Sequence, residues 1–140
     1  MGPSEPSPEL VSLLTSNEFS FRTMYINGST LVESDLERAA ASQAKCVFVL
    51  VDHHSSNPGS ADSESILTAV SIKRHIQSTC EPDSTPFACV LQLLMPESKE
   101  HYLSLYATSG EEQIVCISDL KLCMLARSAG KPPIVGVKRV

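Results

Sequence analysis

The residues best suited to metal or acid–base chemistry follow an apolar run near the middle of the chain. Asp52, His53 and His54 stand directly at the end of that run. Imidazole and carboxylate groups are metal ligands, so this cluster could hold a transition metal. Neighbouring side chains on an extended chain point to opposite sides, however, and no third histidine lies at a matching spacing. We therefore expect His53 and His54 to be solvated loop residues.

Asp62 is a second candidate, with Glu64 close behind it. We expect Asp62 at the start of a helix that runs from residue 62 to about 78. At that position its carboxylate either caps the first backbone amides or, with loop carbonyls, offers oxygen ligands to a hard cation. From the residues alone, the capping interpretation is the simpler of the two.

Enzyme signatures are missing from the sequence. It contains no G-x-S-x-G elbow, no G-x-x-x-x-G-K-[ST] phosphate loop and no G-x-G-x-x-G dinucleotide loop. Glu97, Lys99, Glu100 and His101 form a charged helix face, which is typical of solvated surface. The residues therefore give little support to hydrolase chemistry, and we expect no bound dinucleotide.

Length and composition predict one globular domain. The 140 residues are 42% hydrophobic and 19% charged, and the net charge of -5 disfavours nucleic-acid binding. The longest apolar runs, 46–51 and 87–91, are far shorter than the roughly 20 residues of a membrane-spanning helix. We expect a disordered lead-in at 1–7, a folded region at 8–130 and a tail at 131–140.

The five cysteines are odd in number and lack C-x-x-C spacing, so we expect reduced thiols. They are Cys46, Cys80, Cys89, Cys116 and Cys123. Cys46, Cys89 and Cys116 lie in apolar runs, where a thiol behaves as a small hydrophobe.

Strand and helix patterns alternate along the chain. Continuous apolar runs predict strands buried on both faces at 45–52, 87–94 and 113–117. Helical patterns lie at 8–16, 62–78, 96–107 and 119–129. The alternation predicts an α/β fold, Rossmann-like and doubly wound, with a mostly parallel sheet and helices on both faces. The usual first strand and its Gly-rich loop are missing.

Several local signals complete this interpretation. Alternating residues predict a strand at 19–26, ended by Asn27 and Gly28. Ser34 and Glu37 fit a capping box that begins a helix to about residue 42, and Ser118 fits the cap of the last helix. That helix carries an apolar stripe, for which core packing is the simpler interpretation and a ring interface the alternative. The stripe consists of Leu120, Leu122, Met124 and Leu125.

Taken in order, these segments resemble the regulator-of-potassium-conductance (RCK) domain of Slo-type potassium channels. Three motifs carry the resemblance: G-S-x-L-x-x-x-D-L-x-R-A from Gly28, D-x-x-x-I-L-x-A-x-x-I-K from Asp62, and L-x-P-x-x-K-x-H from Leu94. The similarity spans about residues 8–130. It is to the first of the two tandem RCK domains in the alpha subunits of calcium- or sodium-activated channels.

The resemblance implies a sensor, not an enzyme, in the cytosolic part of a potassium channel. Such domains form a homotetrameric gating ring below the pore, and ion binding expands the ring. The implied partners are therefore other RCK domains and the channel pore. In the calcium-activated branch a carboxylate at the position of Asp62 helps to bind Ca²⁺. The preceding loop lacks the acids of that branch, and the segment from Pro96 is as close to the sodium-activated branch, so the ion is Ca²⁺ or Na⁺.

Other functions stay open beside this one. A free-standing soluble module that binds a nucleotide or ion and acts in trans on a transporter is the main alternative. An oxidoreductase fragment is a third, which the missing glycine loop disfavours. Because the pore, the first strand and the second RCK domain lie outside this sequence, we expect an exposed sheet edge or apolar face. Such a surface would bind partner chains or cause aggregation.

Overall fold

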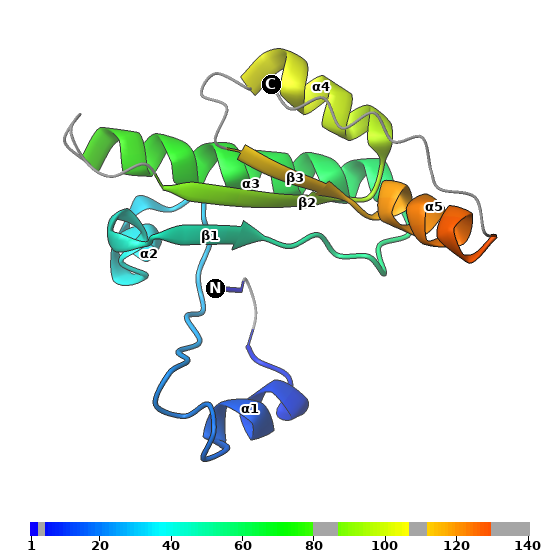
Figure 1. Cartoon of the computed structure of the whole chain (residues 1–140). Coiled ribbons are helices and arrows are strands. Elements are labelled where there is room, and N and C mark those ends of the chain that lie inside the picture. The colour runs from blue at the N-terminus through cyan, green and yellow to red at the C-terminus, as the bar shows by residue number, and fades with distance from the viewer. Residues whose placement is uncertain (3–4, 80–86, 107–111, 130–140) are drawn as a thin grey trace. The chain divides into compact units, whose positions relative to one another are not determined.

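A computed structural model describes residues 1–2, 5–79, 87–106 and 112–129, and Figure 1 shows the whole chain. Its elements, in chain order, are α1 (Pro8–Thr15), α2 (Glu33–Arg38), the 3-10 turn η1 (Ala41–Gln43), β1 (Cys46–Val49), α3 (Pro58–Thr79), β2 (Ala88–Leu93), α4 (Pro96–Tyr106), β3 (Glu112–Cys116) and α5 (Ile117–Ser128). No helix among the described residues is both long and apolar enough to cross a bilayer.

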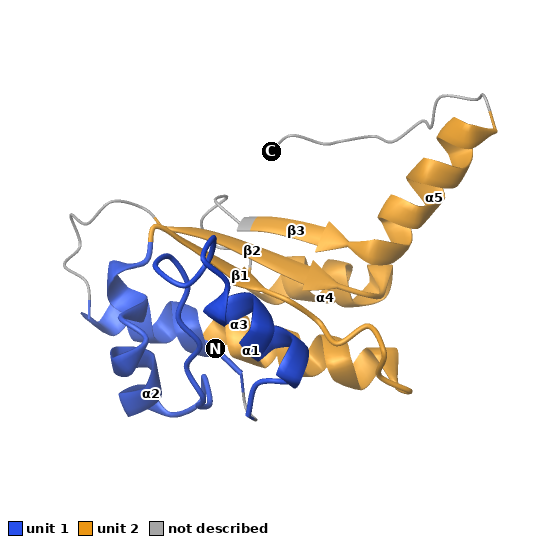
Figure 2. Cartoon of the chain, turned by 90° about the horizontal axis from the view of Figure 1, so that it is seen from below, with its two compact units in different colours: residues 1–44, 71–82 blue, residues 45–70, 83–140 orange. Residues whose placement is uncertain are grey.

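The chain divides into two compact units, coloured separately in Figure 2. Unit 1 comprises residues 1–44 and 71–82, and therefore contains α1, α2, η1 and the second part of α3. Unit 2 comprises residues 45–70 and 83–140, and contains the three strands, the first part of α3, α4 and α5. The predicted tail at 131–140 lies outside the described residues, and the domain boundaries stay a prediction.

Unit 2 is built on a parallel sheet in the order β1-β2-β3. Val49 lies beside Leu91, and Leu91 lies beside Ile114. Each strand overlaps a predicted apolar run, and a helix follows each strand. The predicted α/β class with a parallel sheet is therefore confirmed. The consecutive strand order means that both connections step in the same direction across the sheet.

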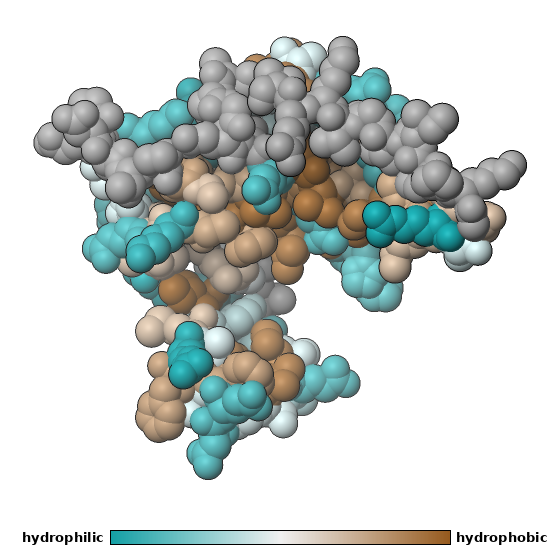
Figure 3. All heavy atoms as spheres, in the orientation of Figure 1, coloured by the Kyte–Doolittle hydropathy of each residue, from teal (hydrophilic) through white to brown (hydrophobic). Residues whose placement is uncertain are grey.

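The two faces of the sheet differ in burial. Side chains alternate along each strand, and one face carries the buried Val49, Leu91 and Leu93. On the other face Cys46 and Phe48 are exposed, and Val90 is half-buried. Burial of the strands on both faces was thus a wrong prediction for β1. Figure 3 shows apolar residues gathered over the strands on this open side.

The described cysteines also differ in burial. Cys89 and Cys116 are buried as small apolar groups, as predicted, whereas Cys46 is exposed on the open face. The four cysteines that the structure describes take part in no disulfide bond: Cys46, Cys89, Cys116 and Cys123. Cys80 lies outside the described residues.

Unit 1 departs most from the sequence interpretation. The segment 19–26, predicted as a strand, forms turns and extended chain, and Phe21 is 92% exposed. A strand needs a partner for its backbone groups, and the backbone bridge found in this part of the chain joins only Gly2 and Asn27. α1 matches its prediction, with Ser7 as its cap, but buries none of its side chains.

Helix α2 begins without the predicted capping box. Its cap residue is Val32, whose side chain makes no capping hydrogen bond. Asp35 provides the local ties instead, because its Oδ2 accepts from the Ser29 amide at 3.0 Å and its Oδ1 accepts from Arg38 at 2.9 Å. A Cβ on Gly28 would lie 2.7 Å from Asp35 Oδ2, so a larger residue in this turn would displace the Asp35 carboxylate.

Two further helix starts also differ. α3 begins at Pro58 rather than Asp62, because Asn57 acts as its cap: Asn57 Oδ1 accepts from the Ser60 amide. α5 begins at Ile117 after Cys116. Its apolar stripe is exposed rather than packed in a core, so core packing was the wrong interpretation for Leu120, Leu122, Met124 and Leu125.

Tyr102 of α4 is 1% exposed, and burial raises the pKa of its phenol to about 12. A pKa raised above the unfolded value of about 10 gives stability that is present below pH 10 and lost as pH rises through about 12. We predict that alkaline unfolding curves between those pH values show a loss of about 2 to 3 kcal/mol. The Tyr102→Phe variant should lack this loss, and an identical curve for both proteins would contradict the prediction.

Candidate functional site

The carboxylate of Asp62 joins α3 to the end of β2. Asp62 lies in the second turn of α3 and is fully buried. Its Oδ1 accepts a hydrogen bond from the Leu94 amide at 2.7 Å, and its Oδ2 accepts one from the Met95 amide at 2.9 Å. Both amides belong to the short link between β2 and α4. Asp62 therefore holds the β2–α4 link, and the predicted role as a cap of its own helix was wrong.

Two backbone amides compensate for the burial of the Asp62 carboxylate. A buried carboxylate needs compensating polar contacts, and hydrogen bonds to an ionised acceptor are short and strong. The Met95 amide stands immediately before Pro96, the first residue of α4. The positive end of that helix dipole therefore favours the charge on Asp62. Both oxygens of the Asp62 carboxylate therefore have hydrogen-bond partners within the fold.

The carbonyl of Leu94 makes a second set of contacts at the same junction. It accepts from Ser118 Oγ at 2.6 Å and from Cys116 Sγ at 3.6 Å. The Leu94 residue thus contacts α3 through its amide and the β3–α5 turn through its carbonyl. Ser118 was predicted to cap α5, and this was wrong: its hydroxyl donates across to Leu94 instead.

An ion pair stands near this junction. Lys99 Nζ of α4 lies 3.4 Å from Asp119 Oδ2 of α5. Both side chains are about one-third exposed or more, so the pair is screened by solvent and contributes little to stability. Lys99 belongs to the charged face that the sequence predicts to be solvated.

The structure leaves the histidine cluster in solvent. His53 and His54 are exposed, as expected, with ring centroids 4.0 Å apart. Asp52 Oδ1 accepts from the His54 amide at 2.9 Å, which shapes the loop. Glu64 is also exposed, unlike the buried Asp62. Among the described residues, no three His, Cys, Asp or Glu side chains gather closely enough to hold a metal.

Sequence reasoning identified Asp62 but missed its partners. Leu94 and Met95 contribute backbone amides, which leave no residue-type signal in a sequence. Ser118 and Cys116 were noticed for other reasons, as a helix cap and a buried thiol. A structural role for Asp62 is visible in its two hydrogen bonds, whereas its role as a cation ligand stays a prediction.

The Asp62 junction makes a direct prediction about stability. In Asp62→Asn, the amide nitrogen of the new side chain must face a backbone N–H, which leaves a buried donor without its acceptor. We expect the free energy of unfolding to fall by about 1 to 3 kcal/mol in urea denaturation. Asp119→Asn is the matched control and should cost less than about 1 kcal/mol. Equal losses of unfolding free energy in the two variants would show that the hydrogen bonds of Asp62 stabilise the fold no more than the exposed ion pair does.

Comparison with known proteins gives a family for this arrangement. Residues 1–100 match the family described as the calcium-activated potassium channel slowpoke-like RCK domain. Potassium channel subfamily T member 1 of mouse is 30% identical over 126 residues, and the human protein of that name is 29% identical over the same length. The aligned region is 89% of this chain but only 9% of each relative.

A solved structure shows a related fold. The human SLO3 gating ring superposes on 91% of this chain with a TM-score of 0.68, at 20% sequence identity. The chain covers 21% of that structure. This likeness concerns the fold, while the family match rests on sequence over most of the chain. The parallel sheet, the motifs from Gly28 and Asp62, and the match over residues 1–100 agree: the chain belongs to the Slo-like RCK domain family.

Proposed function

We propose that this chain is the ligand-sensing regulatory region of a calcium- or sodium-activated potassium channel, on the cytosolic side of the membrane. It would be the first of two tandem RCK domains and would carry out no catalysis itself. The observation that carries this proposal is the family match over residues 1–100. The relatives named as potassium channels extend far beyond the aligned region, which leaves room in them for other parts of a channel.

Exposed apolar surfaces support a role within a larger assembly. β1 lies at one edge of the sheet, and Phe48 on its open face is two-thirds exposed. Leu122 and Met124 on α5 are also mostly exposed. Large exposed apolar patches are typical of interaction sites. We assign the open face of β1 and the stripe on α5 to contacts with other RCK domains in a homotetrameric ring that acts on the pore.

We further propose Asp62 as an ion ligand within this sensor. Each oxygen of its carboxylate accepts one amide hydrogen bond and has capacity for a second interaction. A bound Ca²⁺ or Na⁺ would add charge at the point where α3 meets the β2–α4 link. An ion that binds one arrangement of this link more tightly than another shifts the balance between them. That differential affinity would couple the ion to the ring.

The ion proposal predicts ligand-dependent stability. If Asp62 binds Ca²⁺, the ion at about one hundred times its Kd adds about 2.7 kcal/mol to the unfolding free energy. Thermal unfolding of the 140-residue chain should then shift upward with CaCl₂ but not with MgCl₂, or with NaCl but not with choline chloride. Asp62→Asn should abolish the shift, while Asp52→Asn, which changes an exposed carboxylate, should retain it. No shift with either ion in the native chain, or an unchanged shift in Asp62→Asn, would refute the ion role.

The channel proposal has a separate test. An antibody raised against residues 53–62 should detect, in source cells, a membrane-bound protein much larger than 15.1 kDa. Such a band would place this chain within a full channel subunit. A soluble band at 15.1 kDa would contradict the proposal and favour a free-standing module. This result does not depend on which ion binds.

A further inference from the structure

The imidazole of His75 carries an unusual feature inside unit 1. The side chain projects from α3 and is only 5% exposed. Its Nδ1 is buried and has no hydrogen-bond partner in the part of the chain that the structure describes. Buried polar atoms nearly always have a hydrogen-bond partner. The buried Nδ1 of His75 therefore lacks either a partner or a proton with which to donate to one.

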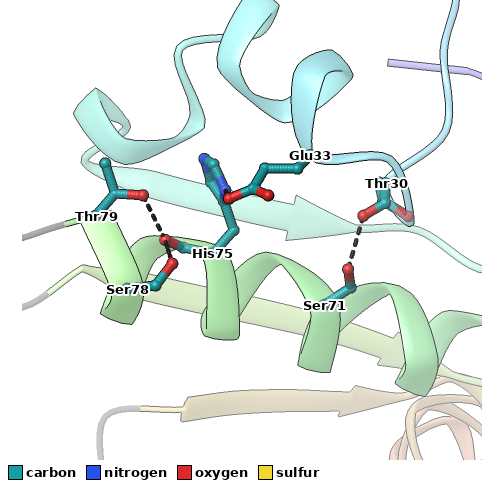
Figure 4. Close-up of polar contacts among 6 residues, drawn as sticks. All are labelled: Thr30, Glu33, Ser71, His75, Ser78 and Thr79. Atoms are coloured by element: carbon teal, nitrogen blue, oxygen red, sulfur yellow. Dashed lines mark hydrogen bonds and ion pairs between the residues drawn. The ribbon is translucent and has the colours of Figure 1, made fainter.

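A carboxylate stands close to this nitrogen without a hydrogen bond to it. Glu33 Oε1, at the start of α2, lies 3.8 Å from His75 Nδ1, which is too long for a hydrogen bond. Figure 4 shows the Glu33 side chain beside the His75 ring. The Glu33 side chain is 76% exposed, so it can change rotamer without disturbing buried packing.

Both residues line a pocket of about 350 Å³ between α2, its preceding segment and α3. The charged groups on that pocket are Glu33 and Arg74, of opposite sign. The Ser71 hydroxyl donates to the Thr30 carbonyl at 2.7 Å, and the Ser78 hydroxyl donates to the His75 carbonyl at 2.9 Å. Neither serine hydrogen is therefore directed to the ring. Glu33 is the anionic group available to a protonated His75.

We propose that protonation of His75 closes a contact between α3 and α2 through Glu33. A proton on Nδ1 creates a donor with positive charge, and a small movement of Glu33 converts the 3.8 Å approach into a charge-assisted hydrogen bond. Arg74, in the same pocket, opposes the added charge, while Glu33 favours it. The contact forms when the ring gains a proton in acid and opens when the ring loses that proton as pH rises.

The effect is expected to be local. α2 is a six-residue helix in which Leu36 is the buried residue, so its hydrogen bonds depend on packing against its neighbours. The hydrogen bond from Ser71 to Thr30 ties the preceding segment to α3 at every pH, because neither partner titrates. Protonation would therefore tighten α2 itself. This acid-sensitive contact belongs to unit 1 and does not rest on the proposed channel function.

Amide hydrogen exchange of the 140-residue chain tests the proposal. The amides of Leu36 and Ala39, bonded to the carbonyls of Val32 and Asp35, report on α2. After correction for intrinsic exchange rates, their protection should rise about two- to five-fold from about pH 7.5 to about pH 5.5, the range for a solvent-screened ion pair. Constant protection in the native chain would overturn the proposal.

Variants separate this contact from general acid effects. Glu33→Gln keeps the size of an exposed side chain and should remove the pH dependence, and His75→Asn should do the same. His101→Asn, at an exposed histidine on α4, is the matched control and should preserve it. A pH dependence that survives in Glu33→Gln would refute the assignment, even if His75→Asn fails to fold.

Discussion

The buried carboxylate of Asp62 is the contact on which the carboxyl end of the sheet depends. It fixes the two amides that follow β2, and the Leu94 carbonyl next to them fixes Ser118 and Cys116 at the β3–α5 turn. One short link thus joins α3, α4 and the start of α5 at neighbouring strand ends. In parallel sheets these ends are where ligands bind. The bonds that hold the fold therefore place both oxygens of the Asp62 carboxylate at this end of the sheet.

The sequence predicted those parts of the fold whose signal is local. Apolar runs located β1, β2 and β3, and Pro96 marked the start of α4, because burial and proline geometry act on the residues themselves. The predicted side-chain caps at Ser34 and Ser118 were wrong. Helix α2 begins after Val32 without a side-chain cap, and Ser118 donates to the carbonyl of Leu94, which is distant in sequence. The strand predicted at 19–26 failed for a related reason, since alternation cannot supply a partner strand.

The candidate site was only half predictable. Asp62 is a charged residue before an apolar helical pattern, which drew attention to it, but its partners are backbone amides of another element. The pocket at His75 gave no signal in the sequence, because the distance from Nδ1 to Glu33 is set by the packing of α2 on α3. Likewise, the exposure of the apolar stripe on α5 could not be predicted, because it depends on which other elements pack against that helix. Periodicity gives only the apolar side of a helix, not what covers it.

If this RCK region works within a larger channel assembly, other segments of the channel cover the open face of β1. Cys46 offers a direct measurement, because it is exposed on the open face of β1. Its rate of reaction with a maleimide can be compared between the isolated chain and the protein in source-cell membranes, using peptide mass spectrometry. If other channel segments cover that face, labelling of Cys46 should be fast in the isolated chain and much slower in membranes, whereas labelling after denaturation should be equal. Fast labelling in both native samples would contradict the account.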